Sequence, residues 1–221
     1  LGISCAAVKL SDAGTLFWHN KDGGAMTKAQ AEAHVKDLQG IVGQGYTLAT
    51  WNGAAFDFDV LAEESGMVEE VADLCMAHTD LMLIVVAVKG WRLGLDALAH
   101  GLRVQGKKHV VTLNDGTEIL DMHGGKAPQL WAAGENQAVL DYLGEDVGTL
   151  DRLLAKLIAN RLTFGWQARS GRWNQFSVPK LFTVEECLKL PRPDVSWMKE
   201  PPVMEDMLAW TGRVKAKGVT S

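Results

Sequence analysis

The sequence predicts a mixed α/β fold from three observations. Residues 46–61 have the composition of a short apolar strand, a glycine-containing turn and a helix, which together make a βα unit. Residues 136–160 carry apolar side chains at the i, i+3 and i+4 spacing of an amphipathic helix. Residues 1–10 and 15–19 have the composition of two strands joined by the turn Ser11–Gly14. These elements predict a sheet with helices packed on it.

Composition limits the class of protein. A chain of 221 residues, 47% hydrophobic and 22% charged, is typical of one globular domain or of one domain with an appendage. No apolar run reaches the roughly 18–20 residues of a membrane span, so we expect no membrane contact. Three scattered cysteines do not make a disulfide framework, which favours a reducing, cytoplasmic compartment. The net charge of −5 argues against a protein that holds nucleic acid mainly by bulk charge.

Helix-start signals place the first two helices. Thr27 and Gln30 have the spacing of a capping box, which predicts a helix that ends near Gly43. A second helix is expected after the Asn-Gly turn of the βα unit, with Phe56 and Leu61 on its inner side.

The middle of the chain alternates helices with short polar turns. Helices are predicted over residues 67–77 and 93–102, and a small hairpin over residues 110–120. Residues 81–88 are apolar throughout, so periodicity favours neither a strand nor a buried helix there. Asp80 directly precedes this apolar run, and a role at the start of a helix is its simplest interpretation.

The C-terminal part is predicted to be a hairpin followed by an irregular extension. Residues 162–178 are expected to form the hairpin, with its turn at Ser170-Gly171. The sequence from Leu181 onward holds four of the six prolines and is expected to wrap over the surface. We therefore expect one domain over residues 1–160, with residues 161–221 packed on it.

Basic and aromatic residues are interleaved in and around the predicted hairpin. From Arg152 to Lys180 there are six basic residues and no acidic one. The aromatic residues among them are Phe164, Trp166, Trp173 and Phe176. This mixture suits a surface for single-stranded nucleic acid, with Arg169 and Arg172 as candidate contacts. The alternative is a hairpin whose aromatic side chains pack on the domain while its arginines face water.

Two short segments contain the acidic candidates. In Tyr142-x-x-x-Asp146, a phenol and a carboxylate are one turn apart on the apolar stripe of the predicted long helix. A carboxylate on that face is costly to bury unless a metal ion or a substrate pairs with it. The segment Asn52–Asp57 follows a predicted strand, at the end where open α/β sheets bind ligands. We expect Phe56 to anchor the helix while Asp57 points toward the strand ends. The stripe of the long helix also holds Val139, Leu143, Val147, Leu150, Leu153, Leu154 and Leu157.

In combination, the two segments resemble a known superfamily. Asn52-x-x-x-Phe56-Asp57 resembles the second exonuclease motif in the proofreading domains of family B DNA polymerases. Tyr142-x-x-x-Asp146 resembles the third motif of the same ribonuclease H-like superfamily, in its tyrosine-type branch. The resemblance covers about residues 1–160, and it implies a mixed sheet flanked by helices. It also implies that Asp57 and Asp146 bind two divalent ions, Mg²⁺ or Mn²⁺, and that Tyr142 orients the attacking water. By the same resemblance, Asn52 and Phe56 lie beside the terminal nucleotide.

The function expected from this resemblance is a 3′–5′ exonuclease acting on single-stranded or frayed ends of DNA or RNA. The superfamily's first motif, Asp-x-Glu, does not precede the first strand of this chain, so we expect residues upstream of Leu1 to supply it. Two alternatives remain open. One is a non-catalytic nucleic-acid-binding or scaffold module on the same fold, and the other is a domain in which Asp57 and Asp146 are only structural.

Overall fold

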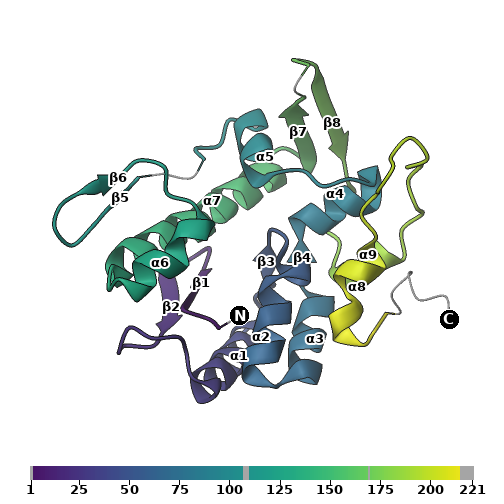
Figure 1. Ribbon diagram of the computed structural model, residues 1–221. Helices are drawn as coiled ribbons and strands as arrows, with labels where there is room; N and C mark the ends of the chain where they lie inside the picture. The colour runs from purple at the N-terminus through teal and green to yellow at the C-terminus, as the bar shows by residue number, and fades with distance from the viewer. Residues whose placement is uncertain (1, 107–109, 169, 215–221) are drawn as a thin grey trace. The chain divides into compact units, whose positions relative to one another are not determined.

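The computed structural model of the protein describes residues 2–106, 110–168 and 170–214. The chain divides into two units, each made from two separate stretches of sequence (Figure 1). The first unit comprises Leu1–Gln30 and Asp96–Ser177, and the second comprises Ala31–Leu95 and Val178–Ser221. This division does not follow the expected boundary between residues 160 and 161, because residues 161–177 belong to the first unit.

Every strand in the described ranges pairs with one other strand, which makes four small sheets. Three pairs are antiparallel: β1 (Cys5–Lys9) with β2 (Thr15–His19), β5 (Val111–Thr112) with β6 (Glu118–Ile119), and β7 (Thr163–Gln167) with β8 (Trp173–Ser177). The fourth pair, β3 (Ala49–Thr50) with β4 (Thr79–Asp80), is parallel. The mixed α/β class is therefore confirmed, while the strands of these ranges form separate pairs in place of the one mixed sheet that was expected.

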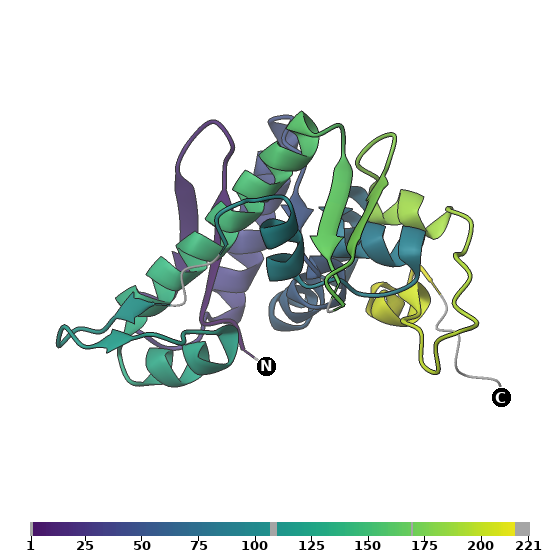
Figure 2. The ribbon, with the colours of Figure 1, turned by 90° about the horizontal axis from the view of Figure 1, so that it is seen from above.

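The first unit is built along the helix α7 (Asn136–Ala159), which follows the prediction within one residue. Strand β1 packs on this helix, and Figure 2 shows the β1–β2 hairpin beside it. The side chain of Phe17, on β2, also approaches the helix closely at a glycine: a Cβ atom on Gly144 would lie 3.2 Å from the ring of Phe17. Helix α6 (Ala127–Ala132) packs on α7 as well.

The predicted hairpins of the first unit are also confirmed. The short β5–β6 hairpin packs on α7, and β7 and β8 pair with Phe164 opposite Phe176. Helix α5 (Leu95–Gly101) approaches β7 so closely that a Cβ atom on Gly101 would lie 2.0 Å from the carbonyl oxygen of Gly165. Only glycine fits at that position without moving the backbone.

In the second unit, helices connect the two parallel strands. The capping box that was predicted at Thr27 is present at the start of α1 (Lys28–Gly43), since the Gln30 N–H donates to Thr27 Oγ1 and the Thr27 N–H donates to Gln30 Oε1. Helices α2 (Asp57–Ser65) and α3 (Val68–Ala77) then lie between β3 and β4 in the chain. The predicted strand over residues 46–51 is shorter than expected, because only Ala49 and Thr50 pair with β4.

The apolar run after β4 is a buried helix, α4 (Leu81–Lys89), and not a strand. All side chains from Leu81 to Ala87 are buried. The helix has defined ends that outweigh the strand preference of its Ile-Val-Val run: Asp80 caps its start, and Gly90 ends it in the left-handed conformation, with φ 77°.

The C-terminal extension contributes core residues, so the expectation that it wraps over the surface was wrong. It contains two short helices, α8 (Val184–Leu188) and α9 (Met204–Met207), and both pack on α4. The buried side chains that it supplies include Val184, Cys187, Met204 and Leu208. Because α4 is apolar on every side, it needs cover from more elements than the short strand β3.

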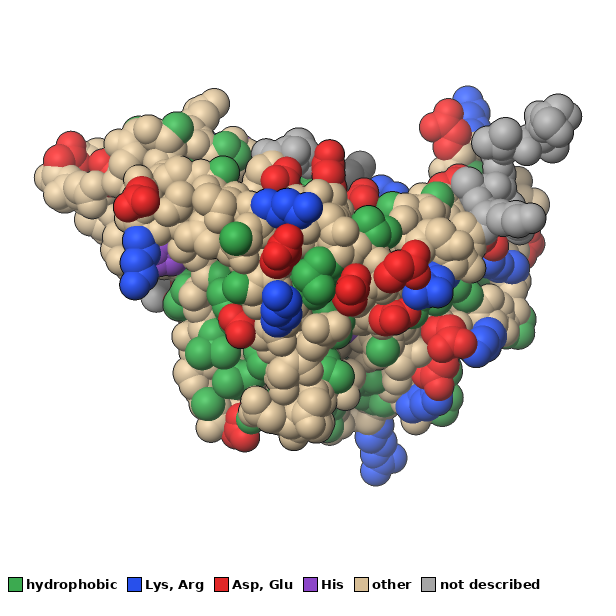
Figure 3. All heavy atoms as spheres, turned by 90° about the horizontal axis from the view of Figure 1, so that it is seen from below, with side chains coloured by type: hydrophobic (Ala, Val, Ile, Leu, Met, Phe, Trp, Pro, Cys, Tyr) green, Lys and Arg blue, Asp and Glu red, His purple; other side chains and the backbone are tan. Residues whose placement is uncertain are grey.

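The surface of the described residues carries charges of both signs. On the face viewed in Figure 3, Lys and Arg side chains lie among Asp and Glu side chains, with hydrophobic side chains between them. None of the helices in the described ranges combines the length and the hydropathy needed to cross a membrane.

Candidate functional site

The segment Asn52–Asp57 is a turn between strand β3 and helix α2. Asn52 adopts a left-handed conformation with φ 68°, and a 3-10 helix over Gly53–Ala55 follows. The Gly53 N–H donates to Thr50 Oγ1 at 3.2 Å. A Cβ atom on Gly53 would lie 2.6 Å from the Thr50 side chain, so glycine is required for this approach. The turn lies at the carboxyl end of β3, as predicted.

A single buried carboxylate, that of Asp80, holds this turn. Asp80 Oδ1 accepts the backbone N–H of Asn52 at 3.0 Å, and Asp80 Oδ2 accepts that of Ala54 at 3.0 Å. Oδ1 also accepts the N–H groups of Met82 and Leu83 at the start of α4, which confirms the predicted helix-start role. One side chain therefore caps a helix and closes the turn 26 to 28 residues earlier in the chain.

His78 also supports the turn, through a hydrogen bond with Thr50. Its Nδ1–H donates to the Cys75 carbonyl at 2.5 Å, so Nε2 is left to accept the Thr50 hydroxyl at 2.9 Å. The ring is fully buried and lies 4.5 Å from the ring of Phe58. Burial lowers the pKa of His78, although Asp80 acts in the opposite direction, and the neutral ring fits the donor and acceptor roles just given.

The C-terminal extension completes the support. The indole N–H of Trp210 donates to the Ala54 carbonyl at 2.9 Å. The N–H and the carbonyl of Ala54 thus bond to two residues that are far from it in the sequence, Asp80 and Trp210. A backbone held in this way has little freedom to rearrange, so the side chains that it exposes keep fixed positions.

Phe56 and Asp57 are the side chains that the turn exposes. Phe56 is 55% exposed, so the expectation that it anchors α2 was wrong. The 3-10 helix shifts the register, and Phe58 takes the inner position instead. Asp57 begins α2 and is exposed as a residue. Desolvation by the surrounding protein atoms, and then the Asp80 carboxylate, nevertheless raise the pKa of Asp57 to about 6.

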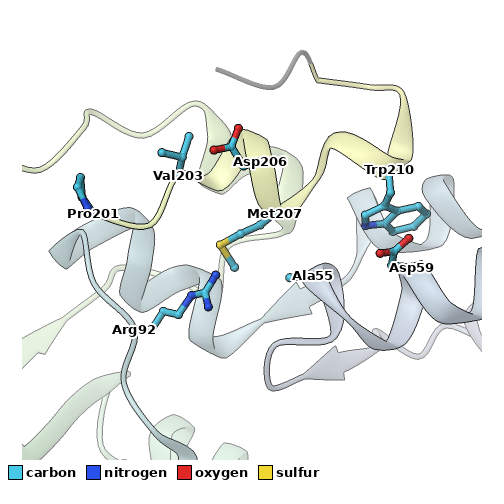
Figure 4. Close-up of a pocket in the computed structure, with 8 residues that line it drawn as sticks. All are labelled: Ala55, Asp59, Arg92, Pro201, Val203, Asp206, Met207 and Trp210. Atoms are coloured by element: carbon cyan, nitrogen blue, oxygen red, sulfur yellow. The ribbon is translucent and has the colours of Figure 1, made fainter. Parts of the chain in front are cut away.

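A cavity of about 370 Å³ lies beside the turn within the second unit (Figure 4). Ala55 and Asp59, on either side of the Phe56–Phe58 segment, line it together with Arg92, Pro201, Val203, Asp206, Met207 and Trp210. Figure 4 shows the guanidinium of Arg92 directed toward Met207. The volume is at the lower end of the range for small-molecule sites, and the charged residues that line the cavity are of both signs, Arg92 with Asp59 and Asp206.

Tyr142 and Asp146 lie one turn apart on α7, in the first unit. Tyr142 is 8% exposed and belongs to a hydrophobic cluster with Val111, Met122 and Ala138. Asp146 is partly buried. The predicted stripe is confirmed at Val139, Leu153 and Leu157, but Thr149 takes the central buried position that was expected of Leu150. The Thr149 hydroxyl is satisfied there because it donates to the Glu145 carbonyl at 2.8 Å.

The β7–β8 hairpin buries most of its aromatic side chains, which was the alternative to a surface for single-stranded nucleic acid. Phe164, Trp166 and Phe176 are buried, and Arg172 is exposed at the turn. Trp173 is the exception, with 50% of its surface exposed. The other predicted nucleic-acid contact, Arg169, lies outside the described residues.

The structure thus places the predicted site residues in two groups. Asn52, Phe56 and Asp57 belong to the second unit, whereas Tyr142 and Asp146 belong to the first. Within the described ranges, no three His, Cys, Asp or Glu side chains gather as a metal-binding group. The residues that sequence reasoning missed are the supports of the turn, Thr50 and Trp210, for which the sequence carries no local signal.

Comparison of the chain with protein-family models, with curated proteins and with solved structures finds no match. A function for the protein therefore has to come from its own residues.

Proposed function

We propose that the protein is a metal-dependent 3′–5′ exonuclease that hydrolyses the terminal phosphodiester bonds of single-stranded or frayed nucleic acid. The observation that carries the proposal is the exposed Asp57 carboxylate, which is held at the carboxyl end of β3 by a turn with buried support. The resemblance of this turn and of Tyr142-x-x-x-Asp146 to two exonuclease motifs, in the expected order, adds to it. A ribonuclease H-like arrangement is part of the proposal, and the parallel pair β3–β4 with its helical crossover is the element that supports it, although the described strands form four separate pairs.

The donor set fits a hard divalent cation. Asp57 and Asp146 offer carboxylate oxygens, the ligands that Mg²⁺ and Mn²⁺ prefer. The raised pKa of Asp57 also fits, because a cation relieves the cost of ionising a desolvated carboxyl close to Asp80. Two bound divalent ions would supply an acidified water and stabilise the charge that develops on the departing 3′ oxygen.

The chain's own residues would position the substrate. Tyr142 is anchored by the cluster around its ring, so its phenol can orient a water molecule without losing conformational freedom at that step. Phe56 presents an exposed ring that can stack on the terminal base. Asn52 begins the same turn and would lie beside the same nucleotide.

The proposal is tested with the protein expressed from its natural reading frame. We expect Mn²⁺-dependent shortening of a 3′-tailed oligonucleotide, and we expect Asp57→Asn and Asp146→Asn each to abolish it. Matched controls are Asp59→Asn, in the same first turn of α2, and Glu145→Gln, next to Asp146 on α7. Both controls should leave the rate unchanged.

Unchanged digestion by Asp57→Asn or Asp146→Asn would overturn the assignment of those residues. An oligonucleotide that is bound but never shortened, with or without Mn²⁺, would favour the non-catalytic binding module instead. If the protein neither binds nor shortens the oligonucleotide, the two carboxylates have a structural role only.

A further inference from the structure

The β7–β8 hairpin sorts its aromatic side chains between its two faces. Alternation along the strands places Phe164, Trp166 and Phe176 on one face, where all three are buried. The rings of Phe164 and Phe176 stack with their centroids 4.8 Å apart and their planes within 9°. Trp166 meets Phe176 edge to face, at 6.2 Å. These three residues form the packing face, so none of them is available to a ligand.

Trp173 is on the opposite face, and its indole is fixed there. Its N–H donates to Gln175 Oε1 at 3.1 Å. Its six-membered ring lies over Gly165 on the neighbouring strand, because a Cβ atom on Gly165 would be 2.6 Å from Trp173 Cζ2. The indole therefore rests on bare backbone while half of its surface meets solvent. A flat aromatic ring held in one orientation loses little entropy when a second ring stacks on it.

Apart from Gly165, the hairpin residues on the face of Trp173 are polar and uncharged. Gln167 lies opposite it in the strand register, and Gln175 lies on the same face. Farther along this face, the hydroxyls of Thr163 and Ser177 are 2.8 Å apart. Arg172 is exposed at the neighbouring turn. The stretch from Arg152 to Lys180 contains six basic residues and no acid. Arg152 pairs with Glu145 and Lys180 with Glu186, and the other basic residues of the stretch leave it with a positive charge.

We propose that Trp173 is a stacking platform for a base of single-stranded nucleic acid, with Arg172 beside it to contact the phosphate backbone. The choice of partner rests on the proposed exonuclease function. A polysaccharide also stacks on exposed tryptophans, but the basic charge of this stretch favours a polyanion. Of the four aromatic residues in the hairpin strands, Trp173 is the one that remains available to a ligand.

Binding is measured without catalysis, by fluorescence anisotropy of a labelled oligo-dT strand of about 15 nucleotides in the presence of EDTA. We expect Trp173→Ala to weaken binding about tenfold, because one base loses its stacking partner. Trp173→Phe keeps an aromatic ring and should recover most of the affinity. The control is Trp197→Ala, which removes a tryptophan that is 69% exposed but lies in the other unit, and it should leave binding unchanged.

Arg172 gives a second, independent readout. Arg172→Gln should reduce the slope of log affinity against log salt concentration by about 0.7, the value for one phosphate contact on a single strand. Trp173→Ala should leave that slope unchanged, since stacking releases no counterion.

Equal affinity of Trp173→Ala and the wild type for oligo-dT would overturn the proposal. So would binding of a neutral β-glucan that depends on Trp173 while oligo-dT binding does not. The outcome is separable from that of the exonuclease test: Trp173-dependent binding by a protein that never shortens the strand would refute the proposed catalysis but not the platform.

Discussion

The turn at Asn52–Asp57 and the helical pair Tyr142/Asp146 present their acidic side chains by different means. The turn uses a left-handed residue, a 3-10 helix and four backbone bonds to one buried carboxylate, of which two go to the turn itself and two to α4. The pair needs only the 3.6-residue repeat of α7 and a hydrophobic cluster for Tyr142. Distant residues hold the backbone of the turn, whereas in the helical pair distant residues pack only on the side chain of Tyr142.

This difference decides what each region tolerates. In α7, each backbone group finds its partner within the helix, so a change at one side chain removes one set of contacts. In the turn, Asp80 serves the backbone of two elements at once, so a change there leaves several N–H groups unsatisfied in a buried setting. Support from a distance gives a fixed geometry, but it makes that geometry depend on a single residue.

The largest expected effect is that of Asp80→Ala. It leaves four backbone N–H groups without their acceptor, so we expect the free energy of unfolding to fall by at least about 4 kcal/mol. Asp59→Ala, an exposed carboxylate in the first turn of α2, should cost only about 0.5 kcal/mol. Urea unfolding followed by circular dichroism measures both. If Asp80→Ala costs as little as Asp59→Ala, the turn does not depend on the Asp80 carboxylate.

Tyr142→Ala should have the next largest effect. Loss of a buried ring from the cluster with Val111, Met122 and Ala138 should cost about 3 kcal/mol. Tyr142→Phe keeps the packing and should cost about 1 kcal/mol or less. The same urea experiment applies, and it separates the ring from the hydroxyl. If both variants cost the same, the hydroxyl and not the packing anchors Tyr142.

Asp57→Asn should have the smallest effect on stability, and that effect should be stabilising. The folded-state pKa of Asp57 is raised to about 6, above the unfolded value of about 3.9, so the folded state holds its proton more tightly. Stability is then lost as the pH rises from about 4 to about 6, and asparagine avoids this loss. Because Asp57 is exposed to solvent, we expect a gain of only about 1 kcal/mol at pH 7.5, and none at pH 4.

Thermal unfolding at the two pH values checks this prediction, with Asp59→Asn as the matched carboxylate-to-amide change in the same helical turn. Equal stability of Asp57→Asn and the wild type at both pH values would mean that Asp57 ionises in the folded protein as it does in water. Added Mn²⁺ should reverse the order at pH 7.5, because a bound cation favours the ionised carboxylate.

Local patterns in the sequence predicted α7, the capping box at Thr27 and the hairpins, because periodicity, caps and turns are read over a few residues. They also placed the turn that begins at Asn52 directly after a strand. They failed at Phe56, since the 3-10 helix that shifts the register depends on bonds from Asp80. The same limit hid Trp210, whose partner Ala54 is 156 residues away.

One missed element did have a local signal. Thr183-x-x-Glu186 forms a capping box at the start of α8, with the Thr183 side chain accepting the Glu186 N–H at 3.2 Å and the Glu186 side chain accepting the Thr183 N–H at 3.1 Å. It is the pattern that identified α1. The prolines near this segment favoured an irregular extension in the prediction. In the structure, α8 packs on the buried helix α4.

We propose that Asp57 and Asp146 serve the same metal-dependent reaction. A double-mutant cycle on the rate of Mn²⁺-dependent shortening of a 3′-tailed oligonucleotide tests it most directly. We predict that Asp57→Asn and Asp146→Asn each lower the rate by about 10³-fold or more, and that the double variant is no slower than either, because residues that act as one unit are not additive. Two results would show that the carboxylates do not serve one reaction. One is a double variant slower by the product of the two single effects, and the other is a single variant with the wild-type rate.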